Sequence, residues 1–114
     1  MGRNQQKGAT FEQDCADYFT AHGCEVIRKR PHGQNDQGDL HGVRFNGKKV
    51  TVECKNHQRM ELAKWVDEAE TEKVNDHAEF GVVIHKRKGK GRAKFGETYV
   101  TMTLETFCKM GKII

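Results

Sequence analysis

The dipeptide Asn46-Gly47 constrains the fold of this chain more than any other feature. It separates two runs of extended character, residues 39–44 and 48–55. Asn-Gly between two such runs is a strong short-range signal for a β-hairpin, because both residues tolerate the positive φ angles of a tight turn. The sequence therefore predicts an antiparallel hairpin near the middle of the chain.

The length of the hairpin loop decides which side chains share a face. A two-residue loop would place Asp39 and Glu53 on opposite faces of the sheet, because successive side chains alternate along a strand. A three-residue loop over residues 45–47, with its glycine in the left-handed conformation as a bulge, pairs Arg44 with Lys48 and sets Asp39 directly across from Glu53. We predict the three-residue loop.

That register sorts the hairpin into a polar face and an apolar face. The polar face carries Asp39, His41, Val43, Thr51, Glu53 and Lys55, and the apolar face carries Leu40, Gly42, Val50, Val52 and Cys54. A one-residue slip would turn the apolar set away from the core. The hydrophobic pattern therefore favours the register that brings the acids together.

Asp39, Glu53 and Lys55 form a candidate catalytic group. Glu53 and Lys55 are two residues apart on one strand, so their side chains point the same way. An acid reaching that face from the neighbouring strand completes a set of ligands for a hard divalent cation, and the lysine is placed to hold an attacking water or a phosphate charge. The pattern indicates metal-assisted phosphodiester hydrolysis. The alternative is a solvated surface pair of little energetic value.

Length and composition bound the architecture. With 114 residues, 35% apolar and 32% charged, the chain is expected to form one domain over residues 1–114 with a lean core. Such a chain can complete its core against a partner subunit, so we expect a homodimer. The four cysteines lack zinc-site spacing and are interpreted as small core residues in a reducing compartment. No signal peptide or bilayer-length apolar run is present, which predicts a cytoplasmic protein, in the host cytoplasm if phage-encoded.

Basic and acidic residues are segregated along the sequence, although the formal net charge is only +4. Residues 61–79 carry seven acids and two lysines, and we expect this acidic helix to lie away from nucleic acid. Two basic clusters are expected to bind the phosphate backbone of DNA. The alternative for the second cluster is a solvated loop. The candidate residues are Arg28, Lys29, Arg30 and His32, and Lys86, Arg87, Lys88, Lys90, Arg92 and Lys94.

The remaining elements follow from periodicity and capping signals. Helical spacing of apolar residues predicts a first helix over residues 8–22, with Thr10 and Gln13 as a capping box, and a second helix that begins near Leu62 and ends near residue 76 or 77. Strands are expected at residues 25–29, 80–85 and 98–102, and a short helix at residues 104–110 with Thr103 as its cap. With the hairpin, the order is α-β-β-β-α-β-β-α, which is an α/β fold.

This order, with acids on a central hairpin, resembles the PD-(D/E)XK, or restriction-endonuclease-like, nuclease superfamily. Within it the chain is most similar to the small Holliday-junction resolvases of archaea and phages. The resemblance covers nearly the whole chain. It rests on Gly8-Ala9-Thr10-Phe11-Glu12, Gly38-Asp39, Val52-Glu53-Cys54-Lys55-Asn56, Trp65 and Tyr99-Val100-Thr101-Met102.

The resemblance implies a central mixed five-stranded sheet flanked by helices. It also implies that Asp39, Glu53 and the main-chain carbonyl of Cys54 hold Mg²⁺, with Mn²⁺ able to substitute. Lys55 would be the catalytic lysine, and Glu12 a further catalytic residue and candidate metal ligand. Such families often place a serine or threonine before the aspartate. This chain has none between residues 31 and 38, where Gln34 and Asn35 are candidates for binding a phosphate.

Three function classes remain open from the sequence. The first is a homodimeric, structure-selective endonuclease that cuts four-way DNA junctions. The second is another nuclease of the same superfamily, acting in restriction, repair or DNA-end processing on branched or duplex DNA. The third is a non-catalytic DNA-binding module, which would gain nothing from acids that face phosphate. In either nuclease we expect Lys55, beside a metal ion and another cation, to have a lowered pKa.

Overall fold

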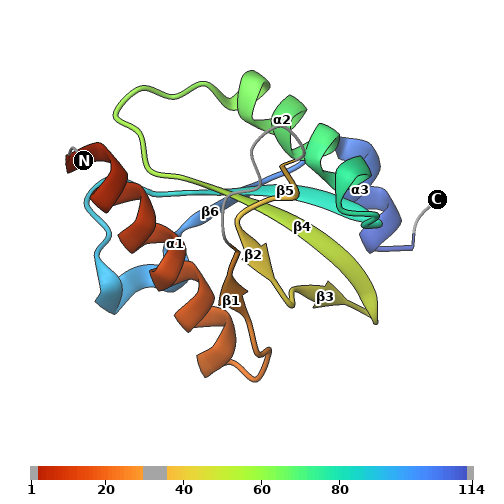
Figure 1. Cartoon of the computed structure of the whole chain (residues 1–114), viewed down its shortest axis with the longest axis horizontal. Coiled ribbons are helices and arrows are strands. Elements are labelled where there is room, and N and C mark those ends of the chain that lie inside the picture. Colours follow the sequence, from red (N-terminus) through yellow and green to blue (C-terminus); the bar gives the residue numbers. More distant parts are fainter. Residues whose placement is uncertain (1–2, 30–35, 113–114) are drawn as a thin grey trace.

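The computed structural model describes residues 3–29 and 36–112. Three α-helices, one 3-10 helix and six strands are found in these residues (Figure 1). In chain order they are α1 (Arg3–Ala21), β1 (Ile27–Arg28), β2 (Leu40–His41), β3 (Arg44–Phe45), β4 (Lys48–Lys55), α2 (Leu62–Asn75), β5 (Phe80–His85), η2 (Arg92–Glu97), β6 (Tyr99–Thr101) and α3 (Leu104–Met110).

The strands form two sheets. A four-stranded sheet has the order β3-β4-β5-β6 and is mixed, because β4 and β5 are parallel while the outer pairs are antiparallel. Strands β1 and β2 form a separate antiparallel pair. The prediction of one central five-stranded sheet is therefore wrong, although the α/β class and the mixed central sheet are present.

A break at Gly42 explains the extra strand. The run predicted as one strand over residues 39–44 is divided into β2 and β3 at this glycine, whose φ angle is +111°. A side chain there would collide with the carbonyl oxygen of Glu25. Glycine therefore permits a close approach of two backbones that another residue would prevent.

The hairpin loop has two residues, so the predicted three-residue loop is wrong. Asn46 and Gly47 have φ angles of 53° and 77°, which are the positive values of a type I′ turn. Arg44 pairs with Lys49 instead of Lys48. This turn twists in the same sense as the flanking strands, which favours it over the longer loop.

Asp39 reaches β4 by another route. After the break at Gly42, β2 pairs with β1, and the Asp39 amide donates a hydrogen bond of 2.8 Å to the carbonyl oxygen of Val52. Asp39 therefore lies beside residues 52–54 and not directly across from Glu53 as predicted. The two-residue loop alone would have placed Asp39 on the face of the sheet opposite Glu53. The break at Gly42 returns it to the side of Glu53.

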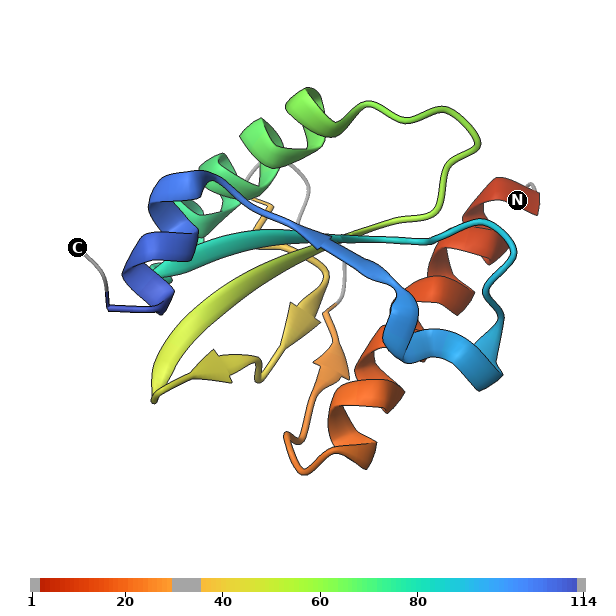
Figure 2. The same ribbon diagram turned by 180° about the vertical axis from the view of Figure 1, so that it is seen from behind.

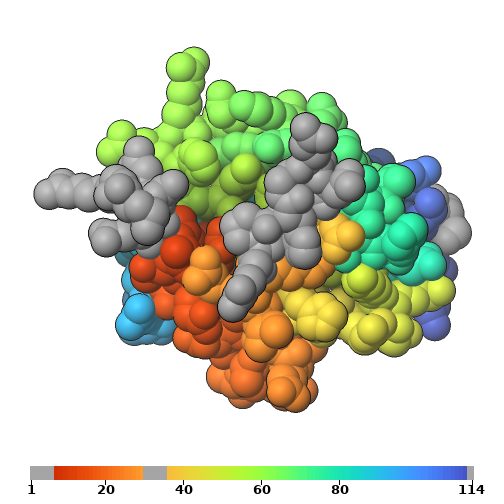
Figure 3. Space-filling view, viewed as in Figure 1, coloured from red at the N-terminus to blue at the C-terminus, as the bar shows by residue number. Residues whose placement is uncertain are grey.

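Two helices cover opposite faces of the four-stranded sheet (Figures 1 and 2). On one face, Phe11, Cys15 and Ala16 of α1 pack against the apolar residues of β4 and β5, and Val26, Leu40 and Val43 join them. On the other face, Trp65 and Ala69 of α2 pack on Val83. Figure 3 shows α1 (red to orange) against the small sheet and hairpin (orange to yellow), with α2 (green) above them.

The predicted faces of the hairpin are largely confirmed. Leu40, Val50, Val52 and Cys54 are buried in the core below α1. Val43, which was predicted on the polar face, lies in that same core because of the break at Gly42. The opposite face of β4 is not open to solvent, since α2 covers it and leaves Thr51 and Glu53 almost completely buried.

The other predicted elements fit with smaller differences. Helix α1 begins at Arg3, before the predicted Gly8, so Thr10 lies within the helix and caps nothing. The predictions for β5 and α3 are confirmed at both ends, and Thr103 caps α3 by accepting a hydrogen bond of 3.0 Å from the Thr106 amide. The basic segment is not wholly a loop, because η2 begins at Arg92.

The four cysteines are all free thiols, and Cys15 and Cys54 lie in the core. The neighbouring Cys15 thiol and burial raise the pKa of the Cys54 thiol, so its side chain is a packing group of the core. Within residues 3–29 and 36–112, no helix is long and apolar enough to cross a bilayer.

Candidate active site

A cavity of about 610 Å³ lies where β4 ends, between α1 and the start of the segment that leads to α2. The four residues predicted to act in catalysis all line it. The lining residues are Lys7, Gly8, Glu12, Asp36, Asp39, Glu53, Cys54, Lys55, Asn56, His57, Gln58 and Glu68.

The backbone around Asp39 fixes its carboxylate against β4. Gly38 precedes it with a φ angle of +90°, and a side chain at Gly38 would collide with Thr51 and the Val52 carbonyl group. The Asp39 Oδ2 atom then accepts a hydrogen bond of 2.7 Å from the amide of Cys54. Glycine before the aspartate is therefore required by the close approach of this segment to β4.

Asp39 and Glu53 are two acids that face each other, Glu53 buried and Asp39 half-buried. Burial raises the pKa of Asp39 to about 8, and the neighbouring Glu53 carboxyl adds to this effect. Burial also raises the pKa of Glu53 to about 8, helped by Glu72 and opposed by Asp39 and Lys55. Two carboxylates in this position either retain a proton or bind a cation.

Lys55 lies between two glutamates. Its Nζ atom is 3.6 Å from Oε2 of Glu53 and 3.4 Å from Oε1 of Glu68. Burial pushes the pKa of Lys55 down, but the two carboxylates raise it above its ordinary value. We expected a lowered pKa for Lys55 beside a metal ion and another cation. In the protein without a metal ion the pKa is raised instead, because acids surround the ammonium group.

Glu12 reaches the cavity from α1 and is held by Arg28. The Nε and Nη2 atoms of Arg28 each lie 3.1 Å from Oε1 of Glu12. Burial and the nearby Asp39 raise the pKa of Glu12, while Arg28 lowers it. Arg28, which was predicted to contact DNA, is placed in the structure as the partner of a predicted catalytic residue.

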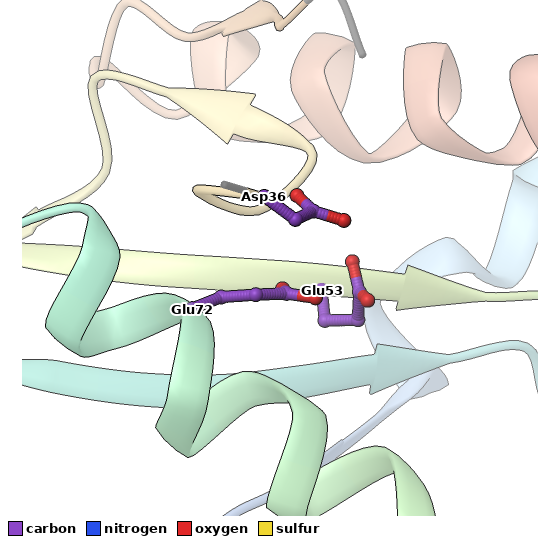
Figure 4. Close-up of side chains that lie close together, drawn as sticks. All are labelled: Asp36, Glu53 and Glu72. Atoms are coloured by element: carbon purple, nitrogen blue, oxygen red, sulfur yellow. The ribbon is translucent and has the colours of Figure 1, made fainter. Parts of the chain in front are cut away.

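Three acids at the site were not predicted. Asp36, Glu68 and Glu72 lie beside Glu53 and Lys55, and Figure 4 shows the Asp36, Glu53 and Glu72 carboxylates turned toward one another. Burial raises the pKa of Glu72 to about 7, although its contact with Glu53 lowers it. Glu68 and Glu72 therefore bring to the site two acids of the helix that was expected to lie away from nucleic acid.

The sequence contained a signal for Glu72. The buried residues of α2 are Trp65, Ala69 and Glu72, which follow the helical spacing of four and then three residues. An acid that continues an apolar stripe points toward the sheet and not toward solvent. Asp36, in a polar loop, carried no comparable signal.

Lys29 belongs to a different, buried cluster. Its Nζ atom lies 2.9 Å from Oδ1 of Asp76, whose other oxygen accepts a hydrogen bond of 2.8 Å from Thr51. Lys49 also contacts Asp76, at 2.8 Å. Because the Lys29 side chain is only 8% exposed, it is occupied by this cluster and is not placed to bind a phosphate.

The other predicted DNA-binding residues are distributed around the β5–η2 connection. Lys86, Lys88 and Lys94 are exposed. Three others form ion pairs: Arg87 and Lys90 with Glu97, at 3.5 and 3.1 Å, and Arg92 with Asp14, at 3.2 Å. Arg30, His32, Gln34 and Asn35 lie outside the described residues.

A family model for the archaeal Holliday junction resolvase (Hjc) matches residues 3–97. The chain belongs to this family. The matched region begins with α1 and ends with η2, so it contains Glu12, Asp39, Glu53 and Lys55, and β6 and α3 follow it. No curated protein and no solved structure matches the chain.

Proposed function

We propose that this protein is a structure-selective DNA endonuclease that resolves Holliday junctions by hydrolysing phosphodiester bonds at the four-way branch. The observation that carries the proposal is the convergence of Glu12, Asp39, Glu53 and Lys55 in one cavity. These residues come from α1, the segment before β2, and β4, and the chain that places them together belongs to a resolvase family. Their order and chemistry are those of a PD-(D/E)XK nuclease, with one nuclease domain over residues 1–114.

The carboxylates of the cavity suit a hard divalent cation, for which we propose Mg²⁺, with Mn²⁺ able to substitute. Asp39, Glu53 and the main-chain carbonyl of Cys54 would hold it, with Glu12 as a further ligand. The fit is supported by the two mutually facing acids, Glu53 buried and Asp39 half-buried, and by their raised pKa values. When bound, such a cation neutralises charge on the scissile phosphate and lowers the pKa of a water molecule.

The protein's own groups then divide the remaining work. We assign Lys55 to the attacking water or a phosphate oxygen, because its ammonium group lies at the cavity and is held by Glu53 and Glu68. The Cys54 amide orients Asp39, and Arg28 orients Glu12. These fixed contacts reduce the reorganisation that the reaction requires.

The proposed substrate is branched DNA bound by a homodimer in the cytoplasm. Two active sites related by two-fold symmetry match a four-way junction, which has a two-fold axis of its own. Exposed Lys86, Lys88 and Lys94 are proposed to contact phosphates along the arms, together with Arg30, His32, Gln34 and Asn35. Arg87, Lys90 and Arg92 would need to exchange an acidic partner for a phosphate.

A cleavage assay tests the proposal. The protein is incubated with a synthetic four-way junction, a flap, a linear duplex and a single strand, each with Mg²⁺ and with EDTA. We expect paired nicks in the junction with Mg²⁺ alone. Asp39→Asn should be inactive, whereas Asp67→Asn, which makes the same change on the exposed side of α2, should cleave normally. Equal cleavage of duplex and junction would contradict the resolvase assignment, and cleavage in EDTA would contradict the metal.

A further inference from the structure

Asp36, Glu53 and Glu72 form a second group of acids beside the proposed catalytic carboxylates. Each offers one carboxylate oxygen, and the three oxygens lie within 4.8 Å of one another. The residues come from three separate elements: the segment before β2, strand β4 and helix α2. Figure 4 shows the three carboxylates converging on the space between that segment and the sheet.

Glu72 supplies an independent reason to expect a ligand there. Its side chain is buried to 5% exposure, and its Oε1 atom has no hydrogen-bond partner among the described residues. In Figure 4 this carboxylate is directed at Glu53 and Asp36. A buried carboxylate oxygen without a donor is costly, so such atoms usually bind a group that the protein itself does not provide.

The protein holds these ligands in place. Asp36 is fixed at both ends, since its Oδ1 atom accepts a hydrogen bond of 2.9 Å from the Gly38 amide and its carbonyl oxygen accepts one of 3.0 Å from Asn75. Asn75 is the last residue of α2, the helix that carries Glu72. The loop acid and the helix acid are therefore tied to one rigid element, as a preorganised site requires.

An ion can reach this group from two sides. Asp36 lines the catalytic cavity, together with Glu53, and also a groove of about 590 Å³ along α2, together with Glu72. Asp67 and Glu68 line that groove as well, and Lys64 is the basic residue beside them, so acids outnumber bases there. The local potential therefore favours a cation.

We propose that Asp36, Glu53 and Glu72 bind a second divalent cation, which shares Glu53 with the cation assigned to Asp39 and Glu53. Carboxylate oxygens are the ligands that Mg²⁺, Mn²⁺ and Ca²⁺ prefer. The inference deepens the proposed function and rests on it in one respect, the occupancy of the Asp39 position. The competing occupant is a proton shared between Glu53 and Glu72.

Mn²⁺ binding without DNA distinguishes these occupants. Bound Mn²⁺ is counted by equilibrium dialysis and by the loss of the free-ion electron paramagnetic resonance signal. Glu72→Gln and Asp36→Asn should each bind one ion fewer per chain than the wild type, and Glu105→Gln, which changes an exposed acid of α3 outside both the cavity and the groove, should bind as many. In Mn²⁺-soaked crystals, anomalous density should appear among the three carboxylates.

Unchanged Mn²⁺ stoichiometry and affinity in both variants would overturn the second site and leave the shared proton. Circular dichroism first establishes that each variant folds. If Glu72→Gln does not fold, Asp36→Asn decides, since it changes only a half-buried loop residue. A wild type that binds the second ion but cleaves no junction contradicts the proposed function alone. Junction cleavage with a single ion per chain contradicts the second site alone.

Discussion

Two buried acids of α2 and its C-terminal cap lie against the same face of β4 and have opposite electrostatic surroundings. Asp76 contacts Thr51, and Glu72 lies beside Glu53, two residues further along the strand. Asp76 also receives Lys29 and Lys49 at 2.9 and 2.8 Å, and these contacts lower its pKa despite burial. Glu72 receives no cation among the described residues, and burial raises its pKa to about 7.

We interpret Asp76 as a structural acid and Glu72 as a candidate functional one. Asp76 and Glu72 lie on the same face of β4 and are similarly buried. Lysines neutralise the Asp76 carboxylate, whereas Glu72 lies among other acids. A protein gains stability from a buried acid only when cations or donors compensate it. Acids that remain uncompensated are therefore candidates for binding a metal or moving a proton.

The largest expected effect is on catalysis at the uncompensated end. Asp39→Asn should reduce single-turnover junction cleavage by at least about 10²-fold, because it removes a charged group that stabilises the reaction. Stability should be maintained or should rise, since the amide oxygen can still accept the Cys54 hydrogen bond and one of two facing acids is removed. Cleavage rates and urea denaturation measure the two effects. A large loss of stability with cleavage unchanged would reverse our assignment.

The next effect is on stability at the compensated end. Asp76→Asn should lower the free energy of unfolding by about 3–5 kcal/mol, because it leaves the Lys29 ammonium group buried without its partner. Lys73→Met is the matched control: it removes a half-exposed ion pair with Glu70 on the same helix and should cost about 0–1 kcal/mol. Urea denaturation measures both. Equal costs for the two variants would show that burial does not distinguish these pairs.

The pH dependence of stability should differ in sign between the two ends. Asp39 and Glu53 have pKa values of about 8 in the folded protein, above those of the same residues in the unfolded chain. Their contribution to the free energy of unfolding is therefore complete at low pH and is lost as the pH rises toward about 8. The pKa of Asp76 is lowered, so its contribution to the free energy of unfolding is present at neutral pH. That contribution is lost as the pH falls through the lowered pKa of Asp76.

Melting temperatures in EDTA measure this dependence. From about pH 5 to about pH 8 we expect the melting temperature of the wild type to fall, and to fall less in Asp39→Asn. Mg²⁺ should reduce the fall, because it replaces the protons that the acids lose. A melting temperature that rises over this range in EDTA would show that the acids are compensated in a way the structure does not contain.

The sequence predicted which residues share the cavity better than it predicted how the backbone places them. Glu53 and Lys55 were grouped by strand alternation, which is a strict rule, and the structure places both with Asp39 in one cavity. Phe80–His85 was predicted as a strand because a continuous apolar run requires burial on both faces. The loop was wrong because a break at Gly42, which depends on a distant contact with Glu25, restored the register elsewhere. Tertiary contacts of this kind leave no local pattern.

The cluster of Lys29, Lys49 and Asp76 is a second case in which a distant contact could not be predicted from the sequence. Lys29 was predicted to bind DNA because it stands in a basic run, but its partner is 47 residues away in the sequence. Charge in a sequence indicates how many cations a region has, and the fold decides which of them are already paired. Glu72 differs, because its place on the α2 stripe made its orientation predictable.

The smallest expected effect is on DNA binding by exposed lysines for which no ion pair with an acid is found in the part of the chain that the structure describes. Lys86→Gln and Lys88→Gln change exposed residues, so each should weaken junction binding several-fold and lower the salt slope by about 0.9 for each phosphate that the variant no longer binds. Lys109→Gln, on α3, is the control and should change neither. Electrophoretic mobility shifts at several salt concentrations measure this. Weaker binding at an unchanged salt slope would mean that these lysines affect folding and do not contact phosphates. Whether a lysine is paired or exposed in the structure would then not indicate whether it binds DNA.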